Sequence, residues 1–280
     1  MNMTHAKPRM GRIEYLNVLP IYHALETGLV PHGYELVYGP PAALNDLMCA
    51  GELAAASTSC IEYARRPERY WLMPDLAIGS HGAVMSVLLL SRVPVADLEG
   101  KTVLVSAETH TSAALLRILL KEHARVNVNF VTGNATERMA TGNPPEAVLA
   151  IGDEALRLRK RPAYPYIWDL GAAWLEWTGL PFTFGVWVVS KDEALRRTLA
   201  EDPVAVLHAG RDWGEAHMDT ILDIAEGNYP LSRQELTDYF KGLSYKLGDI
   251  EQQGLLLFYD RLAAAGEIAN APALDFWPGL

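Results

Sequence analysis

Short apolar runs alternate with amphipathic stretches along most of the chain, and each kind of segment predicts a different element. Nearly continuous apolar runs predict buried strands. Five strands are predicted in the first third of the chain, at residues 9–14, 35–38, 54–57, 77–79 and 85–91. Between them, apolar residues recur at helical spacing in stretches opened by Pro20 and Pro41, and in a third from 58 to 65. This alternation predicts a parallel sheet with helices on both faces.

The clearest strand, turn and helix unit lies at residues 101–120, KTVLVSAETHTSAALLRILL. Its first part predicts a buried strand, and its apolar residues from 113 to 120 predict a helix. Thr109, Thr111 and Ser112 lie at the join, where backbone N–H groups of the first helical turn are unpaired. The join therefore predicts a site for a carboxylate or a phosphate. The alternative is that Thr111 or Ser112 only caps the helix.

A change of lobe is predicted at 92–100, where Pro94 and Gly100 flank a short polar segment. Beyond it, further strands are predicted at 127–131 and 147–151. A tryptophan-rich helix and an apolar strand within 168–190 lead back toward the first lobe. We predict two α/β lobes, each a mainly parallel sheet flanked by helices. Residues 1–93 and 188–280 form lobe one, and residues 94–187 form lobe two.

The last third of the chain is predicted to be mainly helical. Helix starts are expected at Asp192, at Pro203, at Ser232 with Glu235 in a capping box, and at Asp249. Residues 243–247, LSYKL, are compatible with one more short strand.

Polar side chains follow several of the predicted strands. Asn17, Ser86, Thr111, Ser112 and Asp153 all map to strand ends or starts at the expected lobe boundary. Ligands bind at the carboxyl ends of the strands in open parallel sheets, and here both lobes would direct those ends into one cleft. The convergence of these side chains favours ligand binding over helix capping at residues 109–112.

Composition narrows the possible partners. The 280 residues, half of them hydrophobic, predict a globular protein of one large or two moderate domains. A net charge of −10 and the lack of a basic stripe argue against nucleic acid or an anionic membrane as a partner. No apolar run is long enough to span a bilayer, and residues 1–20 lack the apolar core of an export signal, so a cytoplasmic location is expected. Cys49 and Cys60 are interpreted as reduced core thiols.

Six stretches carry a resemblance to a known family. They are GRIEYLN at 11–17, GSHGAVMSVLLLS at 79–91, TSAALLRILL at 111–120, IGDEAL at 151–156, DLGAAWLEWTGLPFTFGVWV at 169–188 and SYKLGDIEQQGLLLFYDRL at 244–262. In this order they resemble chorismate dehydratase of the futalosine route to menaquinone. The family is similar in fold to type II periplasmic solute-binding proteins. The resemblance implies a two-lobed cleft that closes on chorismate without a metal or an organic cofactor.

The resemblance also implies roles for individual residues. Asn17 and Ser86 would lie near the reacting carbons and act as the catalytic residues. Thr111 and Ser112 would hold a substrate carboxylate through side chains and backbone N–H groups, and Asp153 would face the cleft from the second lobe. The full set of predicted substrate-binding residues is Thr111, Ser112, Asp153, Gly82 and Thr109.

The implied reaction removes the C4 hydroxyl and the C3 hydrogen of chorismate and makes the ring aromatic. The sequence offers no obvious base, because His23, His81 and His110 are scattered and paired carboxylates are absent. Asp153 is one candidate by location, although it also suits a helix cap. The preferred hypothesis is that the enolpyruvyl carboxylate of the substrate takes the proton, while Asn17 and Ser86 orient it.

Two other functions stay open at this point. One is the sibling enzyme of the same pathway, 1,4-dihydroxy-6-naphthoate synthase, and the other is a non-catalytic binder of a small carboxylate. The oligomeric state, monomer or homodimer, is also open.

Aromatic residues gather around the expected return crossover. Trp168, Trp174, Trp177 and Trp187 are interpreted mainly as packing residues. Phe182 and Phe184 alternate along one strand and are divided between the core and the cleft.

Overall fold

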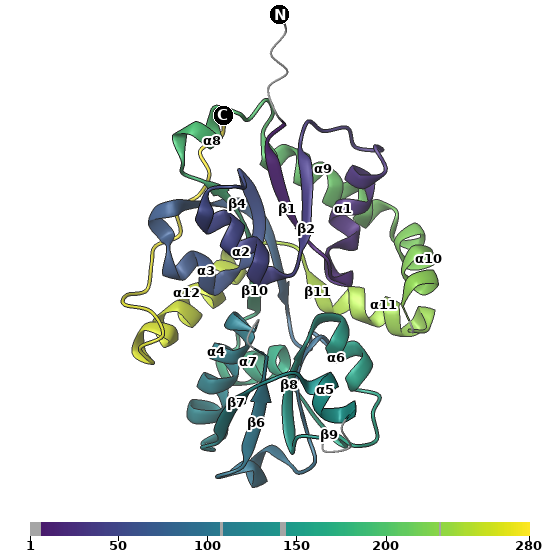
Figure 1. Ribbon diagram of the computed structural model, residues 1–280, viewed down its shortest axis with the longest axis vertical. Helices are drawn as coiled ribbons and strands as arrows, with labels where there is room; N and C mark the ends of the chain where they lie inside the picture. Colours follow the sequence, from purple (N-terminus) through teal and green to yellow (C-terminus); the bar gives the residue numbers. More distant parts are fainter. Residues whose placement is uncertain (1–6, 107–108, 141–143, 230) are drawn as a thin grey trace, which may run out of the picture.

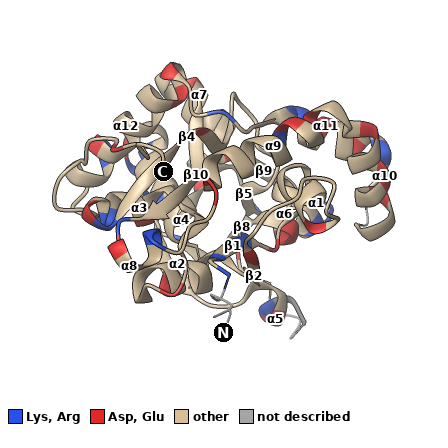
Figure 2. Cartoon of the chain, turned by 90° about the horizontal axis from the view of Figure 1, so that it is seen from above, with Lys and Arg blue, Asp and Glu red and all other residues tan. Residues whose placement is uncertain are grey.

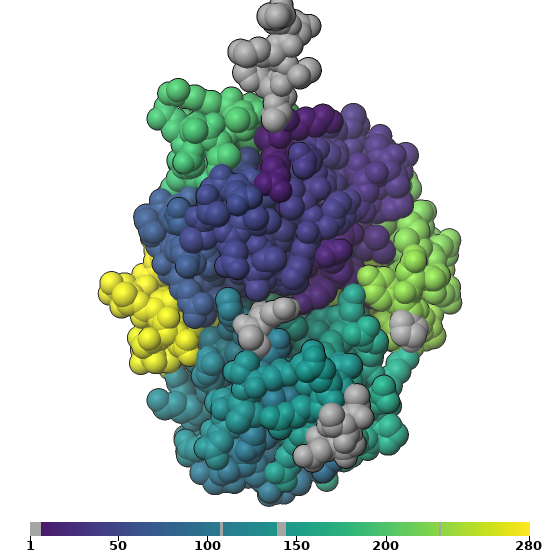
Figure 3. Space-filling view, in the orientation of Figure 1, coloured from purple at the N-terminus to yellow at the C-terminus, as the bar shows by residue number. Residues whose placement is uncertain are grey.

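The computed structural model describes residues 7–106, 109–140, 144–229 and 231–280. The chain forms two lobes, each built on one sheet (Figure 1). Both ends of the chain contribute to one lobe, and its middle forms the other (Figure 1). In the space-filling view the lobes meet along a seam (Figure 3).

Lobe one contains a six-stranded sheet in the order β11-β4-β10-β3-β1-β2. β1 is parallel to β2 and β3, whereas β10 runs antiparallel to β3 and β4, and β11 antiparallel to β4. The strands are β1 (Arg9–Ile13), β2 (Glu35–Gly39), β3 (Ala55–Ser59), β4 (Tyr70–Ser80), β10 (Phe182–Ser190) and β11 (Leu243–Ser244).

Lobe two contains a five-stranded sheet in the order β7-β6-β8-β5-β9. β6 is parallel to β7 and β8, and β5 is antiparallel to β8 and β9. Both sheets are therefore mixed, whereas the sequence predicted mainly parallel sheets. The strands are β5 (Val87–Ser91), β6 (Thr102–Val105), β7 (Asn129–Thr132), β8 (Ala147–Ile151) and β9 (Tyr166–Asp169).

Helices cover both sheets. Those of lobe one are α1 (Leu19–Glu26), α2 (Pro41–Ala50), α3 (Cys60–Arg65), α8 (Glu193–Arg196), α9 (Pro203–Ala216), α10 (Met218–Asn228), α11 (Arg233–Gly242) and α12 (Asp249–Ala264). Those of lobe two are α4 (His110–Ile118), α5 (Ala135–Ala140), α6 (Gly152–Leu158) and α7 (Leu170–Thr178). Short 3-10 turns occur at η1 (Leu16–Val18), η2 (Pro67–Arg69) and η3 (Val95–Leu98), and a π-helical turn, η4 (Leu119–Ala124), continues α4.

The predicted helix starts after residue 190 are confirmed. Asp192 caps α8 by accepting from two backbone N–H groups, and Pro203 lies in the first turn of α9. Ser232 and Glu235 form the expected capping box of α11. Charged residues of both signs surround α10 and α11 (Figure 2), where the guanidinium of Arg233 pairs with acidic side chains of α10.

The point where the chain changes lobe differs from the prediction. The strand expected at 85–91, before the crossing, is β5, and it pairs with β8 and β9 in the second sheet. The chain therefore leaves lobe one between Ser80 and Val87 and returns between Thr178 and Phe182. The apolar run VLLLS is buried in either placement, so its hydrophobicity did not reveal which sheet it joins.

Close helix packing fixes the entry to α1, just after η1. α9 lies along α1, and a Cβ at Gly214 of α9 would come within 1.9 Å of the Pro20 carbonyl oxygen. Only glycine allows the two backbones to approach this closely. The contact holds the first turn of α1, and with it the η1 turn, against the rest of lobe one.

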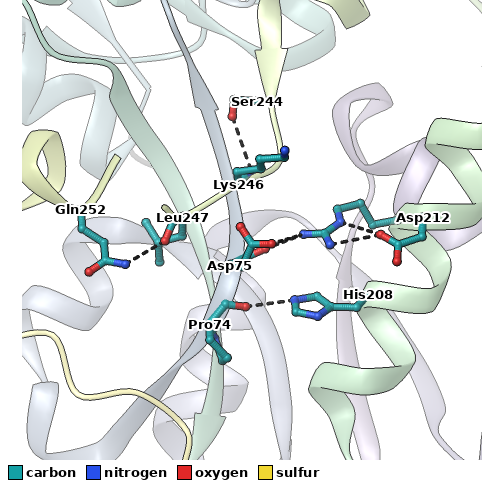
Figure 4. Close-up of polar contacts among 9 residues, drawn as sticks. Pro74, Asp75, His208, Asp212, Ser244, Lys246, Leu247 and Gln252 are labelled. Carbon is teal, nitrogen blue, oxygen red and sulfur yellow. Dashed lines mark hydrogen bonds and ion pairs between the residues drawn. The ribbon is translucent and has the colours of Figure 1, made fainter. Parts of the chain in front are cut away.

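β4 is irregular at its centre, where its register with β10 shifts. Asp75 has a left-handed backbone, with φ of 48°. The nearly buried Arg211 guanidinium of α9 donates to the Asp75 carbonyl at 2.6 Å and also pairs with Asp75 and Asp212, while His208 contacts the Pro74 carbonyl (Figure 4). On the other side of β4, the segment containing Leu247 closes on α12 through a bond from Gln252 (Figure 4). The contacts from Arg211 and His208 hold the irregular part of β4 against α9.

Candidate active site

An open cavity of about 660 Å³ lies between the lobes. Its walls include the carboxyl ends of β1 and β3 from lobe one and of β8 from lobe two. This is the edge at which the sequence predicted ligand binding. Residues lining the cavity are Ile13, Tyr15, Asn17, Pro41, Thr58, Ser59, Ile78, Phe184 and Gly185 from lobe one, with Val84, Ser86, Val87, Thr109, His110, Thr111, Ser112, Ile151 and Gly152 from the crossing and lobe two.

Five of the seven predicted site residues line this cavity, namely Asn17, Ser86, Thr109, Thr111 and Ser112. They come from three separate segments of the chain and from both lobes. The structure therefore brings together residues that the sequence placed near each other only through the expected fold. Asp153 and Gly82 lie outside the cavity lining.

Asn17 lies in the η1 turn between β1 and α1. Its backbone carbonyl accepts a hydrogen bond of 2.7 Å from the hydroxyl of Tyr245, which fixes the turn. The side-chain oxygen of Asn17 is buried and has no hydrogen-bond partner within the described part of the chain. A buried polar atom without a partner is costly, so this oxygen is suited to bind a hydroxyl or another donor of a ligand.

Ser86 lies just before β5 and is 3% exposed. The hydroxyl of Tyr239, from α11, donates to Ser86 Oγ at 3.3 Å. Burial raises the pKa of Tyr239, so its hydroxyl stays protonated at neutral pH. The Ser86 hydroxyl itself donates a long hydrogen bond of 3.4 Å to the Val84 carbonyl. Ser86 Oγ therefore accepts one hydrogen bond from Tyr239, and its O–H can rotate to donate a hydrogen bond to a ligand.

The N-terminus of α4 reaches the cavity without a side-chain cap. The helix begins at His110, and no described side chain caps it. The hydroxyl of Thr109 is buried without a partner among the described residues. Thr111 Oγ1 instead accepts from the Ile61 backbone N–H at 3.3 Å, across the lobe boundary. The alternative that Thr111 or Ser112 caps the helix is therefore wrong.

Asp153 connects the lobes beside the cavity. Its carboxylate accepts a hydrogen bond of 3.2 Å from the Leu16 backbone N–H of lobe one and another from the Tyr229 hydroxyl. Burial raises the pKa of this carboxyl, although the Leu16 N–H opposes the shift. Asp153 lines an adjoining hollow that shares Tyr15 and Thr109 with the cavity, so its place at the substrate cleft stays a prediction. Gly82, also expected there, accepts from the Ser80 hydroxyl through its carbonyl at 2.8 Å, outside the lining.

Of the three histidines considered as a base, only His110 lines the cavity. His81 pairs with Glu251 of α12 at 2.6 Å, and the His23 ring lies 5.5 Å from the Trp213 ring. Within the described residues, no group of three or more His, Cys, Asp or Glu side chains is placed to hold a metal ion. The described helices include none that is long and apolar enough to cross a membrane.

Phe182 and Phe184 alternate along β10, and one faces the core while the other faces the cavity. Phe184 lines the cavity, whereas Phe182 is buried against Trp174 and Phe258. Trp174 and Trp187 are fully buried, which confirms the packing interpretation for these two.

Several residues at the site were not predicted from the sequence. Thr58 and Ser59 are the last two residues of β3, directly before α3, so a search for hydroxyl residues at a junction of strand and helix would have found them. Tyr239 and Tyr245 contact the site from distant helical and loop segments, and no local pattern marks them.

Comparisons with known proteins agree on one family. The model of a family described as Menaquinone biosynthesis matches residues 8–264. A chorismate dehydratase of Thermus thermophilus is 28% identical and covers 90% of this chain and 94% of its own length. A chorismate dehydratase of Campylobacter jejuni is 30% identical over 68% of this chain and 70% of its own length. A 1,4-dihydroxy-6-naphtoate synthase of Thermus thermophilus is 27% identical over 94% and 97% of the two chains.

One solved structure illustrates the fold. The periplasmic aliphatic sulphonate binding protein of Escherichia coli superimposes with a TM-score of 0.65 at 12% identity, covering 98% of this chain and 92% of its own. The two-lobed architecture is therefore that of the periplasmic binding proteins, as the sequence predicted.

Proposed function

Because the chain belongs to the menaquinone biosynthesis family, we propose that it is a chorismate dehydratase of the futalosine route, a lyase acting in the cytoplasm. The enzyme converts chorismate to 3-[(1-carboxyvinyl)oxy]benzoate and water. The observation that carries this proposal is the inter-lobe cavity. It joins the buried oxygen of Asn17 and the hydroxyl of Ser86 to the N-terminus of α4, and neither the Asn17 oxygen nor this helix end has a side-chain partner within the described residues.

The polar groups of the cavity suit a substrate with carboxylates on an apolar ring. Apolar walls from Ile13, Ile78, Val84 and Phe184 would contact the ring. The N-terminus of α4 offers backbone N–H groups and the positive end of the helix dipole to a carboxylate. We place the ring carboxylate of chorismate there, with the Ser112 hydroxyl beside it.

The reaction needs one proton removed and one hydroxyl expelled. The C3–H bond breaks and its electron pair forms the new ring double bond. The C4–O bond breaks with its electron pair on oxygen, and the leaving hydroxide becomes water by taking up the proton that the base removed from C3. The C3 proton is vinylogous to the ring carboxylate, so negative charge that develops on its removal spreads toward that carboxylate. Donors fixed at α4 would stabilise this charge more in the transition state than in the ground state.

The enolpyruvyl carboxylate of the substrate is the proposed base. The enolpyruvyl ether is attached at C3, so this carboxylate is held close to the C3 proton. We assign to the side-chain NH2 of Asn17 the orientation of this carboxylate, and to Ser86 the donation of a hydrogen bond to the departing C4 hydroxyl. Two contacts support these assignments. The Ser86 hydroxyl donates only a long hydrogen bond within the protein, and the Tyr245 hydroxyl fixes the turn that holds Asn17.

The alternative, a 1,4-dihydroxy-6-naphthoate synthase, is favoured by the similarity to the Thermus thermophilus synthase. That enzyme would act on a larger cyclised substrate and would need a more specialised base. His110 is the one histidine of the described residues that lines the cavity, and it is exposed. The cavity lining thus favours the dehydratase. A non-catalytic binder of a small carboxylate would use the same α4 terminus.

The decisive experiment incubates chelator-treated protein with chorismate, following loss of the diene absorbance and identifying the product by mass. We expect a product one water lighter than chorismate. Asn17→Ala and Ser86→Ala should each lower kcat by about a hundredfold, the usual order for losing a transition-state donor. Full turnover by both variants would refute the residue assignments, and binding without turnover would indicate a binder.

A further inference from the structure

The segment that precedes Ser86 has an unusual backbone. Met85 has a left-handed conformation, with φ of 61°, which is unfavourable for a residue with a side chain. A left-handed residue reverses the local direction of the chain. The conformation of Met85 therefore decides where the next residue, Ser86, points. Ser86 lines the cavity, whereas Met85 itself does not.

One carboxylate holds this segment in place. Asp169 lies at the end of β9 and caps α7, and it accepts hydrogen bonds from four backbone N–H groups. Its Oδ1 accepts from Val84 at 3.1 Å, from Gly171 at 3.0 Å and from Ala172 at 3.1 Å. Its Oδ2 accepts from the Met85 N–H, the shortest of the four contacts at 2.7 Å.

We propose that Asp169 is a positioning residue for the reaction, which keeps Met85 left-handed and thereby presents the Ser86 hydroxyl to the substrate. This inference rests on the proposed function of the cavity. Charge-assisted hydrogen bonds of this length are among the stronger ones in proteins, so they can offset the strain at Met85. Capping α7 alone would require only the bonds to Gly171 and Ala172.

The two oxygens of Asp169 allow the two roles to be separated. In Asp169→Asn, the amide oxygen in the place of Oδ1 keeps the bonds from Gly171 and Ala172, so the cap survives. The amide NH2 then faces the Met85 N–H, donor against donor, and the bond that holds Met85 is lost. Met85→Gly supplies the compensating change, because glycine adopts a positive φ without steric cost.

The experiment compares wild type, Asp169→Asn, Met85→Gly and the double variant with chorismate as substrate. We expect Asp169→Asn to lower kcat by about tenfold with little change in KM, the order of losing one charge-assisted hydrogen bond. The kcat of the double variant should be at least about threefold higher than that of Asp169→Asn, because a glycine at position 85 stays left-handed without the hydrogen bond to residue 169. Asp192→Asn, which alters the cap of α8 outside the cavity, should leave kcat unchanged.

A second readout does not depend on turnover. The Gly152 N–H donates to the Ser86 carbonyl at 2.7 Å, so its hydrogen exchange reports whether the segment keeps its place. We expect faster exchange of this amide in Asp169→Asn and recovery in the double variant. Unchanged exchange, or a double variant no more active than Asp169→Asn, would overturn the inference. Absence of turnover by wild type would overturn the proposed function instead, and the exchange result would still decide the role of Asp169.

Discussion

Removing the hydroxyl of Tyr239 tests how Ser86 is prepared for catalysis. Tyr239→Phe deletes one oxygen from a fully buried side chain and leaves its ring packed with Leu16 and Leu236. The deleted hydroxyl donates to Ser86 Oγ at 3.3 Å. Without this donor, the Ser86 hydroxyl is free to turn, and its lone pairs lose the group that fixes their direction.

The size of the effect follows from the contact. A buried hydrogen bond between neutral groups contributes about 0.5–1.5 kcal/mol, and we use the middle of that range, about 1 kcal/mol. If that free energy holds Ser86 in its productive orientation, kcat falls about fivefold in Tyr239→Phe. The same loss should lower Tm by about 2–4 °C for a chain of this length.

The assay is steady-state turnover of chorismate in a double-mutant cycle with Ser86→Ala. Because Tyr239 acts through Ser86, Tyr239→Phe should have almost no further effect once Ser86 is alanine. Tyr164→Phe is the matched control, because it removes a buried hydroxyl that donates at 3.1 Å to the Pro145 carbonyl, away from the cavity. A fivefold loss that persists in the Ser86→Ala background, or that also appears in Tyr164→Phe, would show that the reasoning is wrong.

Three further perturbations address other parts of the molecule. Gly152→Ala places a Cβ at 3.2 Å from the Tyr15 ring at a φ of 54°, so kcat/KM should fall about tenfold, whereas Gly179→Ala, equally left-handed but with open space around it, should leave kcat/KM unchanged. Burial raises the pKa of the Cys60 thiol from 9.0 to about 12, so its contribution to the free energy of unfolding is present below pH 9 and is lost as the pH rises toward 12. The free energy of unfolding, measured with urea, should therefore fall between pH 8 and about pH 10.5. This fall should be smaller by about 2 kcal/mol in Cys60→Ala than in the wild type, and equal falls would contradict the reasoning. Lys160→Ala removes an exposed ion pair between the lobes, so KM should rise about twofold at low salt and not at high salt, with kcat unchanged.

The sequence was informative wherever the signal is local. A strand end followed by hydroxyl residues and a helix is written within about a dozen neighbouring residues, and the prediction at residues 109–112 placed three cavity residues correctly. The two-lobed fold was predicted for the same reason, because the alternation of strands and helices repeats along the chain. The capping box at Ser232 is likewise complete within four residues.

The sequence was uninformative wherever the partner of a segment is distant. The run at 87–91 is apolar enough for the centre of either sheet, and its pairing with β8 and β9 depends on residues about 60 to 80 positions away. Tyr239 and Tyr245 have the pattern of ordinary buried residues in their own segments. Their roles come from hydroxyl contacts to Ser86 and Asn17 across the fold. Asp153 lies at the lobe boundary beside the cavity, and a carboxylate after a strand suits either the cleft or that boundary, so the sequence pattern alone does not separate the two.

The charge of the cavity bears on the choice of base. No described residue that lines it is an aspartate, glutamate, lysine or arginine. A lysine or arginine would bind a dianionic substrate more tightly, but a cation next to a carboxylate lowers the pKa of that carboxylate and weakens it as a base. Neutral hydroxyl, amide and backbone donors hold the substrate with a smaller effect on its basicity. A lining of this kind therefore suits a reaction in which the substrate supplies its own base, and it favours that hypothesis over a protein carboxylate.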